Sequence, residues 1–458
     1  RELAASPERR RRNWDRIFPT AEESAKRSGK KRAAMRQRFG QLIGLVDRRL
    51  TSVPGHSIHF EFPGRGAQPL ELARGKESVV LAVRWKVLEG VTAEGLMIMP
   101  IMPRQPRACV VAIPDAAWTP EQFCGIEPGV PASAQLPRRL AAAGCLVVVP
   151  LLISRDDEFS GHPDVAYTNQ THREFIYRQA FEMGRHVIGY EVQKVLAAID
   201  LLDGFDKGPA KKLPVGLVGI GEGGLLALYT SALDPRVDST LVCGYFDQRE
   251  QLWREPICRN VFGILVEFGD AELAGMIAGR RLVIQPCRVP RVDGPPPVRA
   301  GRRSVAAPGR ITLQRGESVR AEFQRARKLL ARQGAEKQIR LAWHEHFAQQ
   351  DAGSASAIED FAEGLGIVAS FDKPPPKWKL SPKSNRPTAE QNQARQKRQF
   401  DELQGHVQDL MRKSPQVRDL RWLKGPAKLS DWEATGRRHR ERVYDELIGR
   451  LPDRRLPA

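Results

Sequence analysis

The chain has 458 residues, a formal net charge of +19, and 41% hydrophobic residues. This apolar content suffices for a sizeable core, and no run approaches the roughly 18 apolar residues of a membrane-spanning helix. We therefore expect a soluble protein of one large domain or two to three ordinary domains. Six cysteines are scattered without a C-x-x-C pair, which argues against a zinc site. We expect no metal and no cofactor.

The positive charge is concentrated at the two ends. Residues 1–40 carry a net charge of +8 and residues 371–458 carry +9, whereas residues 41–370 carry only +2. A surface for polyanions would have to be built from these ends. The runs Arg9–Arg12 and Lys30–Arg32 are more simply explained as solvated helix faces than as nucleic-acid contacts. Nucleic acid is not the expected partner.

The first residue is Arg1 and not Met, and no signal peptide is visible. We expect that a leader or a longer segment has been removed, which is compatible with export. The cysteine pattern does not decide the compartment, so the localisation stays open.

Hydrophobic spacing predicts helices over residues 1–50, with apolar side chains placed to face a core. Residues 57–62 and 78–100 have the character of strands. Glu89-Gly90 and Glu94-Gly95 supply turn signals within the second of these stretches.

From there, short apolar strands alternate with helical patterns. Strands are predicted at 109–113, 145–152, 214–218, 239–246, 281–286 and 339–344. Helices are predicted at 134–143, 171–203, 225–233 and 317–333. Continuous apolar strands alternating with helices indicate an α/β fold, with a mostly parallel central sheet covered by helices on both faces.

Two irregular stretches interrupt this alternation. Residues 288–311 are rich in Pro, Gly and Arg and are predicted to form a long loop. The Pro-rich stretch 372–387 is typical of a linker, and two helices are expected beyond it, from Thr388 and from Ser430. The expected organisation is a helical segment, a main domain, a linker and a helical extension, at 1–50, 51–371, 372–387 and 388–458.

The most informative stretch joins the strand at 214–218 to the helix at 225–233. It reads Gly219-Ile220-Gly221-Glu222-Gly223-Gly224. A sharp strand-to-helix turn of the form G-x-S-x-G presents the catalytic serine of α/β-hydrolases. Gly221 occupies the position of that serine and offers no nucleophile.

Four further segments accompany this turn: Ile113–Pro120, Thr171–Tyr177, Arg185–Lys194 and Asp234–Asp238. With them, roughly residues 10–420 resemble the α/β-hydrolase superfamily, specifically the bacterial acetyl xylan esterase and dienelactone hydrolase-like group. The resemblance is to a nucleophile-lacking amino-terminal domain that precedes a second hydrolase domain with its serine intact. It implies an α/β-hydrolase fold and a degenerate elbow.

The resemblance also places the other members of a triad. The acid would follow the strand at 281–286, but Gln285, Pro286 and Cys287 stand there. The base would follow the strand at 339–344, where His344 and His346 are candidates. A base without a nucleophile has nothing to activate, and both histidines are equally explained as polar residues at a strand end.

The oxyanion hole would need two N–H donors. One is the backbone N–H of Glu222, which any side chain preserves. The other would come from the loop at Pro114-Asp115-Ala116, where the acidic Asp115 faces a position intended for negative charge. This argues against a working oxyanion hole.

Other residues could supply chemistry in place of the serine. Glu222 could act as a base on water, although it lies one position from the apex of the turn. Cys243 is better explained as a core residue, as is His186 as a packed or hydrogen-bonded side chain. His172, Arg173 and Glu174 are explained by helix capping and ion pairing as well as by substrate contact.

A different class of protein also fits the turn. Gly219, Gly221 and Gly224 match G-x-G-x-x-G, and Asp247 lies 23 residues after the last of them. This is the dinucleotide-binding pattern, but the turn follows several strands instead of opening the fold.

These observations lead to an ordered set of functional hypotheses. We first expect a hydrolase-like domain without serine esterase activity, which binds or supports a second hydrolase domain or another copy of itself. An active hydrolase of carbohydrate or other small esters with a non-serine mechanism is the alternative. Dinucleotide binding and polyanion binding through the basic ends follow.

Overall fold

The computed structural model describes residues 2–18, 21–53, 58–65, 68–161, 167–203, 212–373, 375–382, 386–422 and 428–449. Parts of the expected elements lie outside these residues: 1 and 19–20 of the helical segment, 54–57, 66–67, 162–166 and 204–211 of the main domain, 374 and 383–385 of the linker, and 423–427 and 450–458 of the extension. Residue 57 belongs to an expected strand. The chain divides into two compact units, Arg1–Gly405 and His406–Ala458. Each unit is described by itself.

The first unit is built on a sheet that has ten strands within the described part of the chain, in the order β11-β10-β9-β8-β6-β7-β5-β4-β3-β12. These strands are β3 Glu71–Arg74, β4 Ser78–Leu88, β5 Val91–Pro100, β6 Ala108–Ile113, β7 Cys145–Pro150, β8 Val215–Ile220, β9 Val237–Cys243, β10 Arg281–Gln285, β11 Ile339–Leu341 and β12 Lys379–Leu380. A separate hairpin pairs β1 Gly64–Arg65 with β2 Gln68–Pro69.

The sheet is mixed, with a parallel half that carries the glycine turn. β7, β6, β8, β9, β10 and β11 are parallel to one another, whereas β12, β3, β4 and β5 pair antiparallel. β6, β7 and β8 are buried at every position. Burial on both faces explains their continuous apolar sequences, as expected for parallel strands between helical layers.

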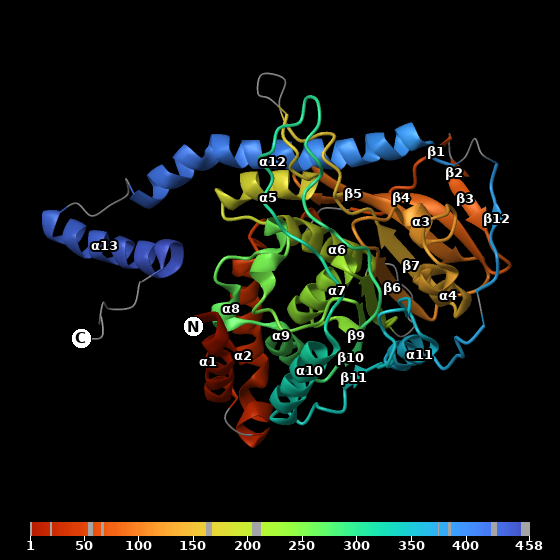
Figure 1. Cartoon of the computed structure of the whole chain (residues 1–458), viewed down its shortest axis with the longest axis horizontal. Coiled ribbons are helices and arrows are strands. Elements are labelled where there is room, and N and C mark those ends of the chain that lie inside the picture. The colour runs from red at the N-terminus through yellow and green to blue at the C-terminus, as the bar shows by residue number, and fades with distance from the viewer. Residues whose placement is uncertain are drawn as a thin grey trace. The chain divides into compact units, whose positions relative to one another are not determined.

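The helices are α1 Glu2–Ile17, α2 Ala21–Leu42, α3 Pro120–Phe123, α4 Leu136–Ala142, α5 His172–Phe181, α6 Val187–Asp203, α7 Glu222–Leu233, α8 Ile264–Glu267, α9 Asp270–Met276, α10 Gly316–Ala331, α11 Ala355–Glu363, α12 Ala389–Trp422 and α13 Leu429–Arg442. α4 and α11 pack on one face of the sheet, and α6 and α7 contact its strands from the other (Figure 1). The expected α/β fold, with helices on both faces of a mostly parallel sheet, is confirmed.

The two amino-terminal helices are part of the first unit. Trp14 and Phe39 are fully buried. Arg10, from the run Arg9–Arg12, is also buried and forms ion pairs with Glu250 at 2.7 Å and Glu272 at 3.1 Å. One member of a run expected to be solvated is therefore an internal structural residue, because two carboxylates compensate its charge.

Three local expectations were wrong. The single helix predicted at 171–203 is two helices, α5 and α6, separated by a turn in which Gly184 has φ +66°. Glu94-Gly95 is not a turn but lies within β5, where Gly95 faces the backbone of Val149 on β7. Of the strand predicted at 57–62, the described residues contribute only an isolated bridge between Glu61 and Arg84.

The first turns of α12 pack against the body of the first unit. The Glu402 carboxylate accepts hydrogen bonds from the backbone N–H of Thr92 and from its hydroxyl, both at 2.8 Å. The buried Lys194 ammonium donates to Gln399. The remainder of α12, with α13 and the π-helical turn Val443–Ile448, belongs to the second unit.

Gly95 gives a direct test of the close approach between β5 and β7. An added Cβ would overlap the carbonyl oxygen of Val149, so we expect Gly95→Ala to lower the free energy of unfolding by about 1–3 kcal/mol, as overpacking does. Gly405→Ala is the matched control, since nothing lies within 4 Å of its Cβ and alanine favours a helix by up to about 1 kcal/mol. Equal changes in the free energy of unfolding for the two substitutions, measured by urea denaturation, would contradict the close approach of Gly95 to the backbone of Val149.

Candidate functional site

The turn between β8 and α7 has a conformation that glycine adopts easily. Gly221 has φ +57° and ψ −112°, a region that residues with a Cβ rarely occupy. A Cβ on Gly219 would overlap the carbonyl group of Gly223, and one on Gly223 would overlap the carbonyl oxygen of Ile113. The glycines are therefore required by the sharp strand-to-helix crossing and its contact with β6, without any ligand.

Asp115 fills the space in front of this turn. It lies in the loop after β6 and is 1% exposed. Its Oδ2 accepts a hydrogen bond of 2.9 Å from the backbone N–H of Glu222, and its Oδ1 accepts one of 2.9 Å from Ala117. A Cβ on Gly221 would overlap Asp115 Oδ2. The carboxylate thus fills the space directly in front of Gly221 and takes up the N–H of the next residue.

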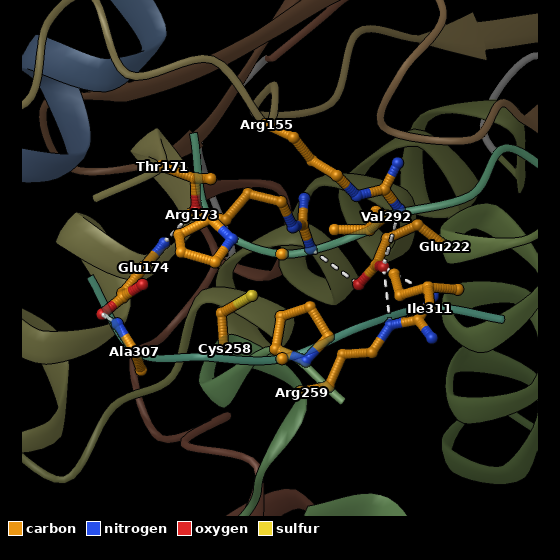
Figure 2. A pocket seen from close by; sticks show the side chains of 14 residues that line it. Arg155, Thr171, Arg173, Glu174, Glu222, Cys258, Arg259, Val292, Ala307 and Ile311 are labelled. Carbon is orange, nitrogen blue, oxygen red and sulfur yellow. Dashed lines mark hydrogen bonds and ion pairs between the residues drawn. The ribbon is translucent and has the colours of Figure 1, made fainter. Parts of the chain in front are cut away.

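Glu222 is surrounded by three guanidinium groups (Figure 2). Its Oε1 accepts from Arg173 at 2.9 Å, and its Oε2 accepts from Arg155 at 3.2 Å and from Arg259 at 2.9 Å. Burial raises the pKa of Glu222, but the positive charges of Arg173, Arg259 and Arg155 outweigh that effect and hold the pKa far below its ordinary value. Glu222 is a permanent anion and a very weak proton acceptor at neutral pH.

The ion pairs extend beyond Glu222 on both sides. Arg173 also binds Glu191 through two hydrogen bonds of 2.9 and 2.8 Å. Arg259 also pairs with Glu255 at 2.8 Å. Arg155 forms ion pairs with both Asp115 and Glu222. Every buried cation at the turn is compensated by the chain itself.

This network was not predicted from the sequence. For Arg173 the sequence allows helix capping and ion pairing as well as substrate contact, and for Arg155 and Arg259 it gives no signal. They lie 67 and 37 residues from Glu222 along the chain, and no spacing rule connects them. The available signal was a buried glutamate at the start of an apolar helix, which needs cationic partners.

The space left beside Glu222 is too small for an ester substrate. The cavity measures about 30 Å³ and is lined by the three arginines, Cys258 and residues of the expected loop at 288–311. Ligand sites are typically about ten times larger, so this cavity holds only water. The loop closes it: Val292 and Ile311 exchange backbone hydrogen bonds across its ends, and Ala307 donates to Glu174 at 2.9 Å.

The other expected triad positions do not complete a site. Gln285 is buried, accepts a hydrogen bond of 2.7 Å from the backbone of Gly353, and donates to the carbonyl of Asp351. His344 and His346 are exposed, lie next to each other, and do not line the cavity at Glu222. Of the expected site residues, the structure brings together Asp115, the glycine turn and Glu222. Ala116 lines a different cavity, which adjoins Arg155.

The geometry also argues against a dinucleotide at the turn. The N–H of Glu222, which would face a pyrophosphate, is taken by the Asp115 carboxylate. Asp247 accepts from the backbone of Gln248 and from the Ser318 hydroxyl. A pyrophosphate would meet a carboxylate at close range, and like charges repel.

Ser154 and His172 form a pair that resembles a nucleophile and its base. Ser154 Oγ lies 3.0 Å from His172 Nδ1. However, His172 Nε2 accepts a hydrogen bond of 3.0 Å from the backbone N–H of Phe159, so the neutral ring carries its proton on Nδ1 and donates to the serine. Burial lowers the pKa of His172 to about 4. In this tautomer, the histidine cannot take the proton of Ser154.

His186 is fixed in a similar way. Its Nδ1 accepts from the backbone N–H of Ile188, and its Nε2 lies 3.1 Å from the carbonyl oxygen of Asn260, to which it donates. Burial lowers its pKa to about 4 as well. As the sequence suggested, it is a packed and hydrogen-bonded residue in the fold.

The described part of the chain contains neither a metal cluster nor a membrane-spanning helix. Within it, no group of three or more His, Cys, Asp or Glu side chains is arranged to hold a metal ion. The helices described are each too short or too polar to span a bilayer. The six cysteines are all buried and unpaired by disulfides.

The two buried histidines predict a pH dependence of stability. Their folded pKa values lie below the unfolded values, so the unfolded chain binds more protons as the pH falls. The contribution of each histidine to the free energy of unfolding is complete above pH 6.5 and is lost as the pH falls toward 4. The loss between pH 7 and 5 is about 2 kcal/mol per histidine. Burial raises the pKa of Asp270 to about 7, which acts in the opposite direction, so the informative quantity is a difference between variants.

We expect the unfolding free energy of wild type, relative to His172→Gln/His186→Gln, to fall between pH 7 and 5 in chemical denaturation. Gly95→Ala, which weakens the fold without touching a histidine, serves as control and keeps the wild-type profile. Parallel profiles for the wild type and the double histidine variant would contradict the lowered pKa values of the two histidines.

No protein-family model matches the chain, and no curated protein matches its sequence. Among solved structures, it is similar to a proposed acetyl xylan esterase from Bacteroides fragilis, with 11% identity over 77% of this chain and 86% of that chain and a TM-score of 0.48. A glucuronoyl esterase from Teredinibacter turnerae matches with 13% identity over 75% and 85% of the two chains and a TM-score of 0.44. A glucuronoyl esterase from Solibacter usitatus matches with 13% identity over 72% and 92% and a TM-score of 0.41. The chain thus has structural similarity to α/β-hydrolase esterases at low sequence identity, and we draw no activity from it.

Proposed function

We propose that this chain is a hydrolase-like domain that does not hydrolyse esters at its glycine turn and serves as a binding or structural domain. The observation that carries the proposal is the Asp115 carboxylate, which accepts the hydrogen bond of the Glu222 N–H in front of Gly221. A partner, either a second hydrolase domain or a second copy of this chain, belongs to the same proposal.

The electrostatics of acyl transfer support this proposal. Ester hydrolysis develops negative charge on the carbonyl oxygen, and an oxyanion hole stabilises it with N–H donors. Here the Glu222 donor is already bound to a fixed anion, and Asp115 is held there by Arg155. A developing oxyanion would have to displace one carboxylate and approach another.

The alternative of a non-serine hydrolase finds less support. A general base needs a pKa near the working pH, whereas the pKa of Glu222 is held far below its usual value by three arginines. His346 is exposed and does not line the cavity at Glu222. The small volume of that cavity leaves no room for an acyl group beside Glu222.

Removing the internal carboxylate should create an anion site. In Asp115→Ala, the Glu222 N–H and the Arg155 guanidinium lose their partner, which we expect to cost about 3–5 kcal/mol of stability. Acetate at about 50 mM should then raise the thermal midpoint of the variant more than that of wild type, since it binds only the folded form. Acetamide at the same concentration, in buffer of matched ionic strength, is the neutral control. Equal shifts in wild type and variant would show that Asp115 does not fill an anion site.

Activity assays test the loss of catalysis. Wild type is expected to hydrolyse p-nitrophenyl acetate at the background rate. Gly221→Ser should remain inactive and be destabilised, because its Cβ overlaps Asp115 and its φ is unfavourable. In Gly221→Ser/Asp115→Ala the overlap is relieved, but the hydrogen bond and ion pair of Asp115 are lost. We therefore expect this variant to be less stable than wild type as well and to show no phosphonate-sensitive burst.

Turnover by wild type that persists with a serine-directed phosphonate and disappears in Glu222→Gln would overturn the proposal in favour of the non-serine hydrolase. Because Glu222→Gln disturbs a buried network, circular dichroism must show that it is folded. His346→Ala, an exposed position, provides the milder second test of that alternative.

A further inference from the structure

A second cavity, of about 550 Å³, touches Arg155 and belongs entirely to the first unit. Its walls are the loop Ala116–Thr119 after β6, the segment Leu151–Phe159 after β7, His172 and the first turns of α12 from Ala389 to Gln396. Its volume lies within the range of about 300–1,000 Å³ that is typical of small-molecule sites. Unlike the cavity at Glu222, it can hold a metabolite.

The cations in its wall are already neutralised. Arg155 is paired with Asp115 and Glu222. Arg395 binds Glu121 through two hydrogen bonds of 2.9 Å. An anionic ligand would therefore find no uncompensated positive charge in this wall and would have to compete with buried carboxylates.

The wall also carries three carboxylates, Asp156, Glu158 and Glu390, and all three are exposed. Glu158 accepts a hydrogen bond of 2.6 Å from Gln393. Asp156 forms no ion pair within the described part of the chain. With the arginines neutralised, the remaining field in the cavity is negative and favours a positively charged ligand.

Two aromatic rings line the same space. Trp118 is half-buried and stacks on Phe123 with ring centroids 6.2 Å apart. Phe159 stacks on the His172 ring at 4.8 Å and an interplanar angle of 4°. Each ring is thus held in place by a neighbouring ring. A cation over an aromatic face gains about 0.5–2 kcal/mol, more when water is excluded.

Ser154 adds a directed polar group and is 93% buried. Its oxygen accepts from His172 Nδ1 at 3.0 Å and from the Asp156 N–H at 3.3 Å. Its own hydroxyl hydrogen has no acceptor within the described residues, although the side chain lines the cavity. A buried donor without an acceptor is costly, and a ligand oxygen would satisfy it.

We propose that this cavity binds a small organic cation that carries a hydrogen-bond acceptor. The ammonium group lies between the Trp118 and Phe159 rings and the Asp156 and Glu158 carboxylates, and its oxygen accepts from Ser154. This inference does not depend on the loss of catalysis at the glycine turn.

Calorimetric titration of the full chain with choline tests the proposal. Its uncharged isostere, 3,3-dimethylbutan-1-ol, has the same shape and hydroxyl group, so we expect it to bind at least about tenfold more weakly. Trp118→Ala should weaken choline binding by about tenfold or more. Trp253→Ala is the matched control, because Trp253 is 61% exposed and does not line this cavity.

Asp156→Asn provides a variant that does not threaten the fold, since its side chain is exposed, and it should weaken choline without affecting the neutral isostere. Absence of saturable choline binding by the folded wild type would overturn the proposal. Equal affinity for the isostere, or equal losses in Trp118→Ala and Trp253→Ala, would overturn it as well.

Discussion

The ion pairs of the buried Glu222 carboxylate stabilise the edge of the sheet at which the parallel strands end. Three guanidinium groups converge on it from separate segments: Arg155 after β7, Arg173 in α5 and Arg259 before α8. Each is too costly to bury without a counter-charge. Glu222, the first residue of α7, therefore joins three segments at the edge of the sheet by compensating the charges of their arginines.

Asp115 completes the same arrangement in front of the turn. Together with Glu222 it neutralises Arg155, and it satisfies two backbone N–H groups at the edge of the sheet. Pre-organised donors of this kind stabilise an oxyanion in hydrolases. Here they bind a side-chain anion of the chain itself, so the local geometry contributes to the stability of the fold.

Much of the fold could be predicted, because continuous apolar strands between amphipathic helices leave a strong periodic signal. The turn at Gly221 was equally visible, since a tight crossing requires glycine at fixed spacing. The partners of Glu222 could not be predicted from the sequence. Arg155 and Arg259 are distant from it along the chain and come close only because of the strand order in the sheet. The break at Gly184 was hidden by an apolar stripe that continues from α5 into α6. The antiparallel position of Gly95 was misread because glycine also signals turns.

The overlap between a Cβ at position 221 and Asp115 imposes an order on sequence change. A serine at position 221 would overlap the aspartate, and loss of the aspartate would leave the buried Glu222 N–H without its acceptor and Arg155 with Glu222 alone. Each single step toward a nucleophile therefore passes through a less stable protein. Positions 115 and 221 therefore depend on each other, and substitution at either one alone is opposed by folding.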